Sequence, residues 1–252
     1  MRKSAKRRRV GLARALSKRG YCSRSQAFSL IRSGRVRLNG KISRNPELPV
    51  QIESDEIQVD GKLIEPSPLL YLMLNKPRGV ITTASDEKGR KTVYGYLPQG
   101  LPWVGPVGRL DKASEGLLLL TNDSEWAARL LAPNHVGKTY HVQIVTIADE
   151  QLFNEMIEGV RSGREILRVK DAKHLRQGER NSWIQVVLEE GKNRHIRRVL
   201  ESLGVEVLRL IRVAIGPLEL GNLRKGEARK LTAEEKQGLD RAIQEADRHT
   251  PP

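Results

Sequence analysis

One carboxylate in this chain lies where acid–base or nucleophilic chemistry could be carried out. Asp111 stands in the stretch Gly108–Asp123, in which a charged tetrapeptide leads into a glycine and four consecutive leucines. The leucine run, Leu117–Leu120, is short and bounded by turn residues, which predicts a buried strand. Asp111 therefore precedes a rigid core element, on a loop that this element can hold still. Precise chemistry is usually built on such loops.

A tyrosine and an arginine in two further segments could complete such a site. Lys138–Val142 places Tyr140 at the start of an alternating strand. Gly191–Arg198 leads into a helix predicted over 192–203, because its apolar residues recur at i, i+3, i+4 and i+7. Arg197 falls on the flank of this apolar stripe, and a half-buried arginine needs a carboxylate partner.

Taken one at a time, the three segments also fit purely structural roles. Asp111 could be a turn carboxylate that pairs with Arg109 or Lys112. Tyr140 could be a core aromatic of its strand. The basic residues of the predicted helix could form a solvated face. Spacing alone leaves these interpretations open.

The net charge of +15 is confined to the first fifth of the chain. Residues 1–46 contain fifteen lysines and arginines and no acidic residue, so the rest of the chain carries equal numbers of basic and acidic residues, 30 of each. A module with such an excess is expected to bind a polyanion. A solvated, solubilising tail is the alternative, above all for residues 2–9, but the charges continue through a patterned, foldable stretch.

The single cysteine, Cys22, excludes an internal disulfide and a metal site built on a cysteine cluster. It also fits a reducing cytosol. No apolar run approaches the roughly 18 residues of a membrane span, and no hydrophobic signal-peptide segment follows the basic start. We therefore expect a cytoplasmic protein with no membrane association. An organelle presequence, which is also basic and free of acidic residues, is the alternative.

The N-terminal segment has the pattern of a small mixed domain. A helix predicted over 12–19 is followed by a second helix, for which Ser23 is a good N-cap. The dipeptides Asn39-Gly40 and Asp60-Gly61 predict tight turns between short strands. Two short helices and a small sheet, with arginines on their surfaces, form a compact unit suited to binding RNA by shape and phosphate contacts.

The remainder of the chain mixes strand and helix signals without strict alternation, which favours an α+β fold with a largely antiparallel sheet. We predict strands at 69–74, 80–83, 117–120, 140–145 and 183–188, and helices at 125–131, after Asp149, at 192–203 and after Thr232. The predicted organisation is a basic tail at 1–11, an RNA-binding domain at 12–64, a proline-containing linker at 65–68, a catalytic domain at 69–240 and a C-terminal tail at 241–252.

Together and in this order, the segments resemble the motifs of the pseudouridine synthases, in particular the branch of the RsuA and RluB/E/F enzymes that act on ribosomal RNA. The matching stretches are Leu72–Gly79, Gly108–Asp123, Lys138–Tyr140, and Gly191–Arg198 continued by Arg209–Gly216. Residues 12–62 resemble the alpha-L fold, on the stretches Ser23–Ala27 and Gly34–Lys41. The resemblance implies an RNA isomerase that needs no metal and no cofactor.

The resemblance also implies roles for individual residues. Asp111 is the essential carboxylate, which attacks the sugar or the base or removes a ribose proton, and the sequence does not choose among these. Arg197 would keep Asp111 ionised and fix its rotamer, while Tyr140 would stack on the uracil and help to remove the C5 proton. Leu210 would form an apolar wall for the base, and Arg109 would fill the gap left by the flipped uridine. The residues that we expect to contact substrate or RNA are Arg109, Leu210, Lys76, Arg194, Arg24, Arg35, Arg37 and Lys41.

Two other functions compete with this one. A ribosome-assembly factor could have kept the scaffold and lost the chemistry, although it would have no reason to retain Asp111, Tyr140 and Arg197. A glycosidase could use Asp111 and Glu115 as paired carboxylates, but the basic N-terminal module favours RNA over a neutral sugar. We expect a monomer that acts on ribosomal RNA or a pre-ribosomal particle, with a weak preference for the large subunit. The sequence does not identify the target uridine.

Overall fold

The structure, a computed structural model, describes residues 9–84, 89–133 and 136–249. Most of the predicted basic tail lies outside the described residues. The chain divides into two compact units. The first comprises Met1–Leu70, Pro98–Gly105 and Thr121–Ser124, and the second comprises Tyr71–Leu97, Pro106–Leu120 and Glu125–Pro252.

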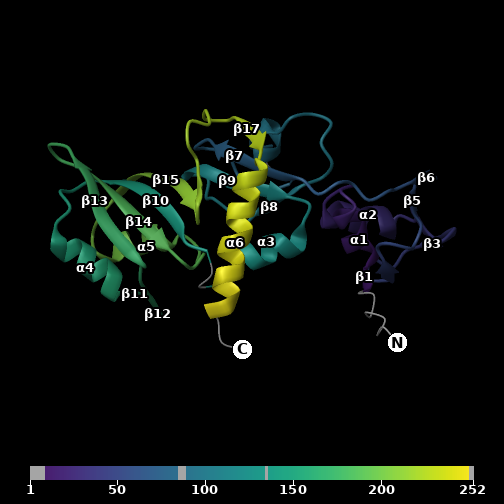
Figure 1. Ribbon diagram of the computed structural model, residues 1–252, viewed down its shortest axis with the longest axis horizontal. Coiled ribbons are helices and arrows are strands. Elements are labelled where there is room, and N and C mark those ends of the chain that lie inside the picture. Colours follow the sequence, from purple (N-terminus) through teal and green to yellow (C-terminus); the bar gives the residue numbers. More distant parts are fainter. Residues whose placement is uncertain (1–8, 85–88, 134–135, 250–252) are drawn as a thin grey trace. The chain divides into compact units, whose positions relative to one another are not determined.

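The N-terminal part of the first unit is built from short helices and short strands (Figure 1). Its elements are β1 (Arg9–Gly11), α1 (Leu12–Lys18), α2 (Arg24–Arg32), β2 (Val36–Leu38), β3 (Lys41–Ser43), β4 (Pro49–Gln51), β5 (Ile57–Val59) and β6 (Lys62–Leu63). The prediction that Ser23 caps α2 is confirmed: its side chain accepts from the Gln26 N–H, and the Gln26 side chain accepts from the Ser23 N–H. This reciprocal pairing is a capping box.

Both predicted turns of this unit are confirmed. Asn39 and Gly40 have φ of 49° and 79°, and Asp60 and Gly61 have φ of 51° and 78°. Positive φ at both central residues is the type I′ geometry, which matches the twist of the paired strands. The turns join β2 to β3 and β5 to β6 in a four-stranded sheet of order β3-β2-β5-β6.

The first unit has its own apolar core, in which the helices pack on the small sheet. Its fully buried members include Leu12, Leu16, Ala27, Ile31, Val36 and Ile57. Val10 also belongs to this core, because β1 pairs with β4. The fold therefore begins within the segment predicted as a tail at 1–11. A single buried valine between Arg9 and Gly11 gives no periodic signal in the sequence.

Within its described residues, the second unit carries one large sheet, the two-stranded sheet β11-β12, four α-helices and one 3-10 helix. Its elements are β7 (Tyr71–Lys76), the 3-10 helix η1 (Val93–Tyr96), β8 (Gly105–Val107), β9 (Glu115–Thr121), α3 (Ser124–Leu131), β10 (Lys138–Ile144), α4 (Glu150–Glu158), β11 (Val160–Ser162), β12 (Glu165–Leu167), β13 (Asp171–Gln177), β14 (Ser182–Leu188), α5 (His195–Ser202), β15 (Val207–Ile215), β16 (Leu218–Glu219), β17 (Ala228–Lys230) and α6 (Ala233–His249).

The strand order of this sheet is β13-β14-β10-β15-β9-β7-β17. β9 and β15 run parallel, whereas β13–β14, β14–β10, β10–β15 and β7–β17 are antiparallel. The predicted α+β fold with a mainly antiparallel sheet is thereby confirmed. The predicted buried strand is β9, all seven residues of which are buried.

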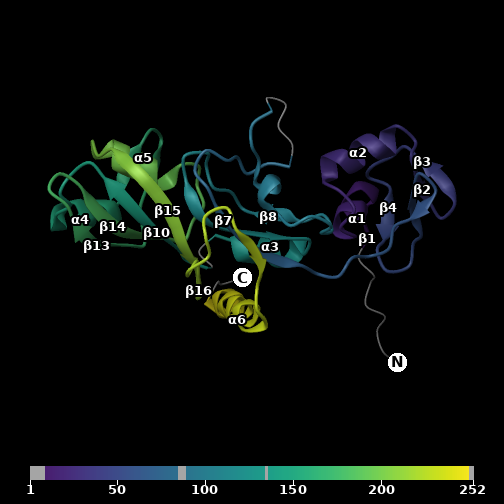
Figure 2. The same cartoon turned by 90° about the horizontal axis from the view of Figure 1, so that it is seen from above.

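Two apolar clusters hold the helices of the second unit on the sheet. Helices α4 and α5 pack on β10, β14 and β15, whereas α3 and α6 pack on β7 and β9 (Figures 1 and 2). The first cluster includes Phe153, Met156, Val199, Leu200, Val142 and Ile184, and the second includes Trp126, Leu130, Leu239, Ile243, Met73 and Leu117. Among the described residues, no helix is long and apolar enough to cross a membrane.

Three predicted elements need correction. The strand predicted at 80–83 is absent: the segment makes a single bridge, from Ile81 to Thr92. The helix predicted over 192–203 begins only at His195, because Arg194 adopts the left-handed conformation at its N-cap, with φ 51°. The C-terminal helix α6 continues past residue 240 to His249, and Ile243 is 1% exposed in the core. Residues 241–249 therefore belong to the folded helix rather than to a tail.

Candidate active site

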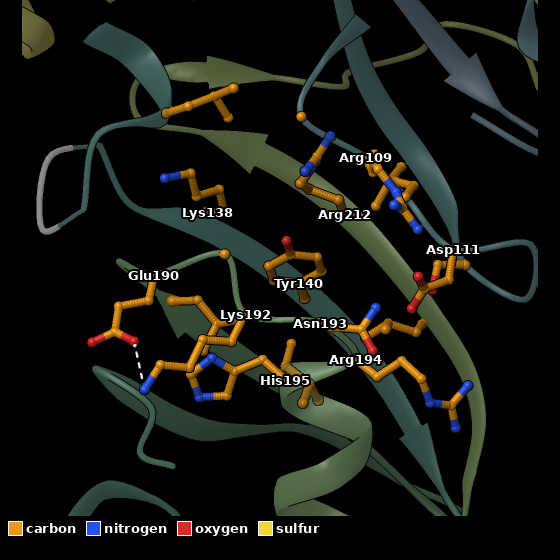
Figure 3. A pocket seen from close by; sticks show the side chains of 18 of the residues that line it. Arg109, Asp111, Lys138, Tyr140, Glu190, Lys192, Asn193, Arg194, His195 and Arg212 are labelled. Carbon is orange, nitrogen blue, oxygen red and sulfur yellow. Dashed lines mark ion pairs between the residues drawn. The ribbon is translucent and has the colours of Figure 1, made fainter. Parts of the chain in front are cut away.

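A cavity of about 630 Å³ opens in the second unit where β10 and β15 meet the loop before β9 and the segment before α5 (Figure 3). Asp111, Tyr140 and Leu210 all line it, so the structure brings together three of the residues singled out from the sequence. Its charged lining comprises Arg109, Asp111, Lys138, Glu190, Lys192, Arg194 and Arg212. Basic groups outnumber acidic groups, which suits a polyanionic ligand.

The loop that carries Asp111 is held by hydrogen bonds from several directions. The Ser114 N–H donates to the Asp111 carbonyl over 3.0 Å, which closes a turn just before β9. The Thr82 hydroxyl donates to the Leu110 carbonyl over 2.8 Å, and the Gly79 N–H donates to the Lys112 carbonyl over 2.7 Å. The prediction of a carboxylate on a loop fixed by a buried strand is confirmed in its geometry.

The ammonium of Lys76 also supports this loop, and its position corrects a prediction. We expected it to contact RNA, but it is 0% exposed at the end of β7. Its ammonium donates to the carbonyls of Pro77, Asp111 and Ser114 over 3.1, 3.0 and 2.8 Å. Burial lowers its pKa to about 8, although Asp111 and Glu115 act in the opposite direction. Lys76 therefore positions the loop and does not touch a ligand.

Tyr140 lies on β10 between β14 and β15, directly opposite Val186 and Arg212. Its ring is half-buried against the core under α4 and α5, while the same side chain lines the cavity. Leu210, 7% exposed, lies opposite Val142 on the neighbouring strand and also faces the cavity. An aromatic ring and an apolar wall in this arrangement can hold a planar base.

Arg197 does not pair with Asp111 as we predicted. Its guanidinium donates to the carbonyls of Ala113 and Val207, over 3.2 and 3.3 Å, and its Nε is buried without a partner. Among the described residues, no ion pair within 4.0 Å joins Arg197 to a carboxylate. Burial lowers the pKa of Arg197, whereas the nearby Asp111 carboxylate acts to raise the pKa of that arginine. The two groups therefore interact electrostatically without forming an ion pair. Arg197 ties α5 to the Asp111 loop through Ala113.

Glu115, the second carboxylate of the glycosidase alternative, is occupied elsewhere. It is 2% exposed and forms ion pairs with Arg209 and Lys225. Burial acts to raise its pKa, but the hydrogen bonds from these two cations hold the pKa below its ordinary value. Glu115 does not line the cavity, so it cannot act with Asp111 as a pair of catalytic carboxylates.

The remaining predicted contacts fall into two places. Arg109 and Arg194 are exposed side chains at the cavity. Arg24, Arg37 and Lys41 are exposed on the first unit, as a phosphate contact requires. Arg35 is also exposed, but its guanidinium makes an ion pair with Asp60 through Nε and Nη2, so part of its hydrogen-bonding capacity is already used.

The sequence did not single out two buried cations of the cavity, Lys138 and Arg212. They are 7% and 5% exposed. Both stood within quoted motif stretches, two residues before Tyr140 and two residues after Leu210, on the same side of their strands. That spacing was the signal that could have found them. Within the described residues, no group of three or more His, Cys, Asp or Glu could hold a metal ion.

Comparisons with known proteins match this arrangement. The family model for RNA pseudouridylate synthases matches residues 70–202, and that for the S4 domain matches residues 10–57. A Bacillus subtilis protein named ribosomal large subunit pseudouridine synthase B is 38% identical over 228 residues, covering 89% of this chain and 93% of the relative. An uncharacterised RNA pseudouridine synthase of Aquifex aeolicus is 35% identical, covering 93% and 95%.

One solved structure, a crystal structure of a pseudouridylate synthase, superposes with a TM-score of 0.64 at 30% identity. It covers 91% of this chain and 99% of that one. The similarity therefore extends over both units, beyond the catalytic motif alone. The chain belongs to the RNA pseudouridylate synthase family and carries an N-terminal S4 domain.

Proposed function

We propose that this protein isomerises a specific uridine of ribosomal RNA to pseudouridine, with Asp111 as the essential carboxylate. The observation that carries the proposal is the convergence of Asp111, Tyr140 and Leu210 on one cavity with a basic lining. A volume of about 630 Å³ falls in the range of sites that bury a small-molecule ligand, which suits a single flipped nucleotide.

The reaction breaks the C1′–N1 bond of the uridine, turns the base and forms a C1′–C5 bond. The C5 proton is lost and N1 gains a proton, so no electrons enter or leave. Asp111 would act on the sugar or the base, or remove a ribose proton, at the start of this sequence. Tyr140 would hold the base by stacking and help to remove the C5 proton, while Leu210 bounds the base on its apolar side.

Arg109 and Arg197 have supporting roles in this proposal. Arg109 is exposed at the cavity, one residue from Leu110 and two from Asp111, so it is placed to fill the gap left in the RNA by the flipped uridine. Arg197 holds the backbone of Ala113 and acts electrostatically on Asp111. Both guanidinium groups would also favour an anionic RNA strand beside the cavity.

We place the target uridine in the large ribosomal subunit, because the similar Bacillus subtilis protein is named for that subunit. The S4 domain supports a structured RNA, since fifteen basic and no acidic residues lie within 1–46. A ribosomal or pre-ribosomal partner, a cytoplasmic location and a monomeric state remain predictions. Cell fractionation and light scattering of the purified protein would test the last two.

A non-catalytic assembly factor on the same scaffold is the alternative. It would need the basic S4 domain but not a cavity lined by Asp111, Tyr140 and Leu210. Pseudouridine mapping of ribosomal RNA from cells with and without this gene separates the two. The enzyme predicts that one or a few positions lose pseudouridine in the deletion strain and regain it when the gene is restored. An unchanged map in the deletion strain would favour the assembly factor.

A further inference from the structure

Two buried cations inside the cavity have no part in the chemistry described above. We propose that Lys138 and Arg212 form a phosphate-binding subsite, which takes a backbone phosphodiester adjoining the flipped uridine. This inference rests on the proposed function. It states which part of the substrate would bind beside Lys138 and Arg212, in the upper part of Figure 3.

Strand geometry puts both cations on the same side of the sheet as Tyr140. Lys138 precedes Tyr140 by two residues on β10, so the two side chains share a face about 7 Å apart along the strand. Arg212 lies directly across from Tyr140 on β15, where paired side chains are about 5 Å apart. A base stacked on Tyr140 therefore has its sugar–phosphate within reach of these two groups.

Arg212 has donor capacity that the protein does not use. It is 5% exposed, and its Nε donates to the Leu117 carbonyl over 2.7 Å, which fixes the guanidinium plane. Its Nη2 is buried and has no hydrogen-bond partner. A buried guanidinium nitrogen left unpaired is costly, and it is commonly found where a ligand supplies the acceptor.

Lys138 adds a second charge that the protein leaves uncompensated. It is 7% exposed and lines the cavity, and among the described residues no hydrogen bond or ion pair is made by its ammonium. Burial and the nearby Arg212 lower its pKa to about 8. Glu189 is the carboxylate that acts on it in the opposite direction, but Glu189 pairs with Lys170.

The acidic groups of the cavity lie elsewhere. In Figure 3, Asp111 lies beyond Arg212 from Lys138, and Glu190 pairs with Lys192 over 3.1 Å. Two desolvated cations with no facing carboxylate call for an anion from outside the chain. A phosphodiester fits best, because a guanidinium and an ammonium can each donate to its free oxygens, and the substrate carries one on either side of the uridine.

The test uses the full-length protein and a synthetic RNA hairpin containing the uridine identified by mapping. Three hairpins are compared: the natural one, and two in which a neutral methylphosphonate replaces the phosphodiester on the 5′ or the 3′ side of that uridine. Each is measured for affinity by fluorescence anisotropy and for single-turnover pseudouridine formation. The proteins are wild type, Lys138→Met, Lys138→Arg and, as a matched control, Lys173→Met, which changes an exposed lysine of β13 outside the cavity.

Removal of one charged hydrogen bond should cost on the order of tenfold in affinity. We expect Lys138→Met to bind the natural hairpin about tenfold more weakly, and one methylphosphonate to weaken wild-type binding by a similar factor. The two losses should not multiply, so Lys138→Met should be nearly insensitive to that methylphosphonate. Lys138→Arg should recover most of the affinity, and Lys173→Met should behave as wild type.

Misfolding of the variant is separated from loss of the subsite by its melting temperature. Methionine is apolar and of similar length, so Lys138→Met should melt at or above the wild-type temperature while binding RNA less well. If the loss from Lys138→Met multiplies with the loss from each of the two methylphosphonates, or if Lys138→Met binds as wild type, the subsite is excluded. The affinity losses from Lys138→Met and from one methylphosphonate could be coupled while the wild-type protein forms no pseudouridine. That result would contradict the proposed function and support the phosphate subsite.

Discussion

The ammonium of Lys76 lies 3.0 Å from the backbone carbonyl oxygen of Asp111, and through this bond a buried cation of β7 holds the loop of the candidate catalytic carboxylate. The same ammonium also binds the Ser114 carbonyl, at the other end of the turn. The position of Asp111 therefore depends on the side chain of Lys76. The substrate cannot reach this side chain, because Lys76 is 0% exposed. A site residue and its buried support are separated here by 35 positions in the sequence.

Replacing Lys76 should damage both the fold and the site. Lys76→Met leaves the carbonyls of Pro77, Asp111 and Ser114 without their donor, and an unsatisfied buried acceptor costs about 1–3 kcal/mol. We expect the free energy of unfolding to fall by about 3 kcal/mol in urea denaturation, and pseudouridine formation to fall well below wild type under native conditions. Lys91→Met, which changes an exposed lysine of the same unit, is the control. A variant as stable and active as this control would show that the loop holds without Lys76.

Much of the fold was predictable where one local signal decided the structure. Asn39-Gly40 and Asp60-Gly61 specify their turns by conformation alone, and Ser23 with Gln26 specifies the start of α2. The leucine run before Thr121 is buried on both faces, so its length and composition were sufficient to identify β9. These elements depend on neighbours in the sequence, and a sequence displays such neighbours directly.

The predictions from the sequence were wrong where contacts between residues far apart in the chain determine the structure. The 80–83 segment has β-branched residues but no partner strand, and Thr82 instead donates to the Leu110 carbonyl. β13 was missed because almost all of its residues are exposed, so it lacks the apolar alternation of a half-buried strand. Lys76 was expected to contact RNA, and a lysine beside a turn is usually solvated, so nothing local in the sequence marked it as buried. Its three carbonyl partners come together only in the folded chain.

Stability should depend on pH through Lys138. Because burial and Arg212 lower its pKa to about 8 from 10.5, the unfolded chain binds more protons than the folded protein between these pH values. The destabilising effect of this lysine is therefore fully present below pH 8 and disappears as the pH rises through that interval. Lys138→Met should exceed wild type in stability by a few kcal/mol at pH 7 and by much less at pH 10.5, as denaturant midpoints would show. A difference independent of pH would contradict the lowered pKa.

RNA affinity should depend on salt through the S4 domain. Each phosphate contact contributes about 0.7 to 0.9 to the slope of log affinity against log salt. The triple variant Arg24→Gln, Arg37→Gln, Lys41→Gln should therefore reduce that slope by about 2.1 to 2.7 if all three side chains touch phosphate. The matched control is a triple variant of exposed arginines in the second unit, Arg180→Gln, Arg241→Gln and Arg248→Gln. Equal slopes for the two triple variants would show that the predicted residues are not the phosphate contacts.

Activity should survive removal of metal ions. The resemblance implies chemistry without metal or cofactor, so pseudouridine formation in a magnesium-independent hairpin should persist in excess EDTA. The hairpin's fold would be checked in the same buffer by its melting curve. Loss of activity in EDTA with intact RNA, followed by recovery with zinc, would contradict the expectation.

Asp111 carries the central claim, and one substitution tests it directly. Asp111→Asn keeps the shape of the side chain and leaves the backbone carbonyl that Lys76 holds, while it removes the charge and replaces one acceptor oxygen by an NH2 donor. Asp171→Asn, on the exposed edge strand β13, is the matched control. We predict that Asp111→Asn binds the RNA nearly as tightly as wild type and forms no detectable pseudouridine in single-turnover assays, while the control keeps full activity. Measurable pseudouridine formation by Asp111→Asn would contradict the assignment of Asp111 as the essential carboxylate.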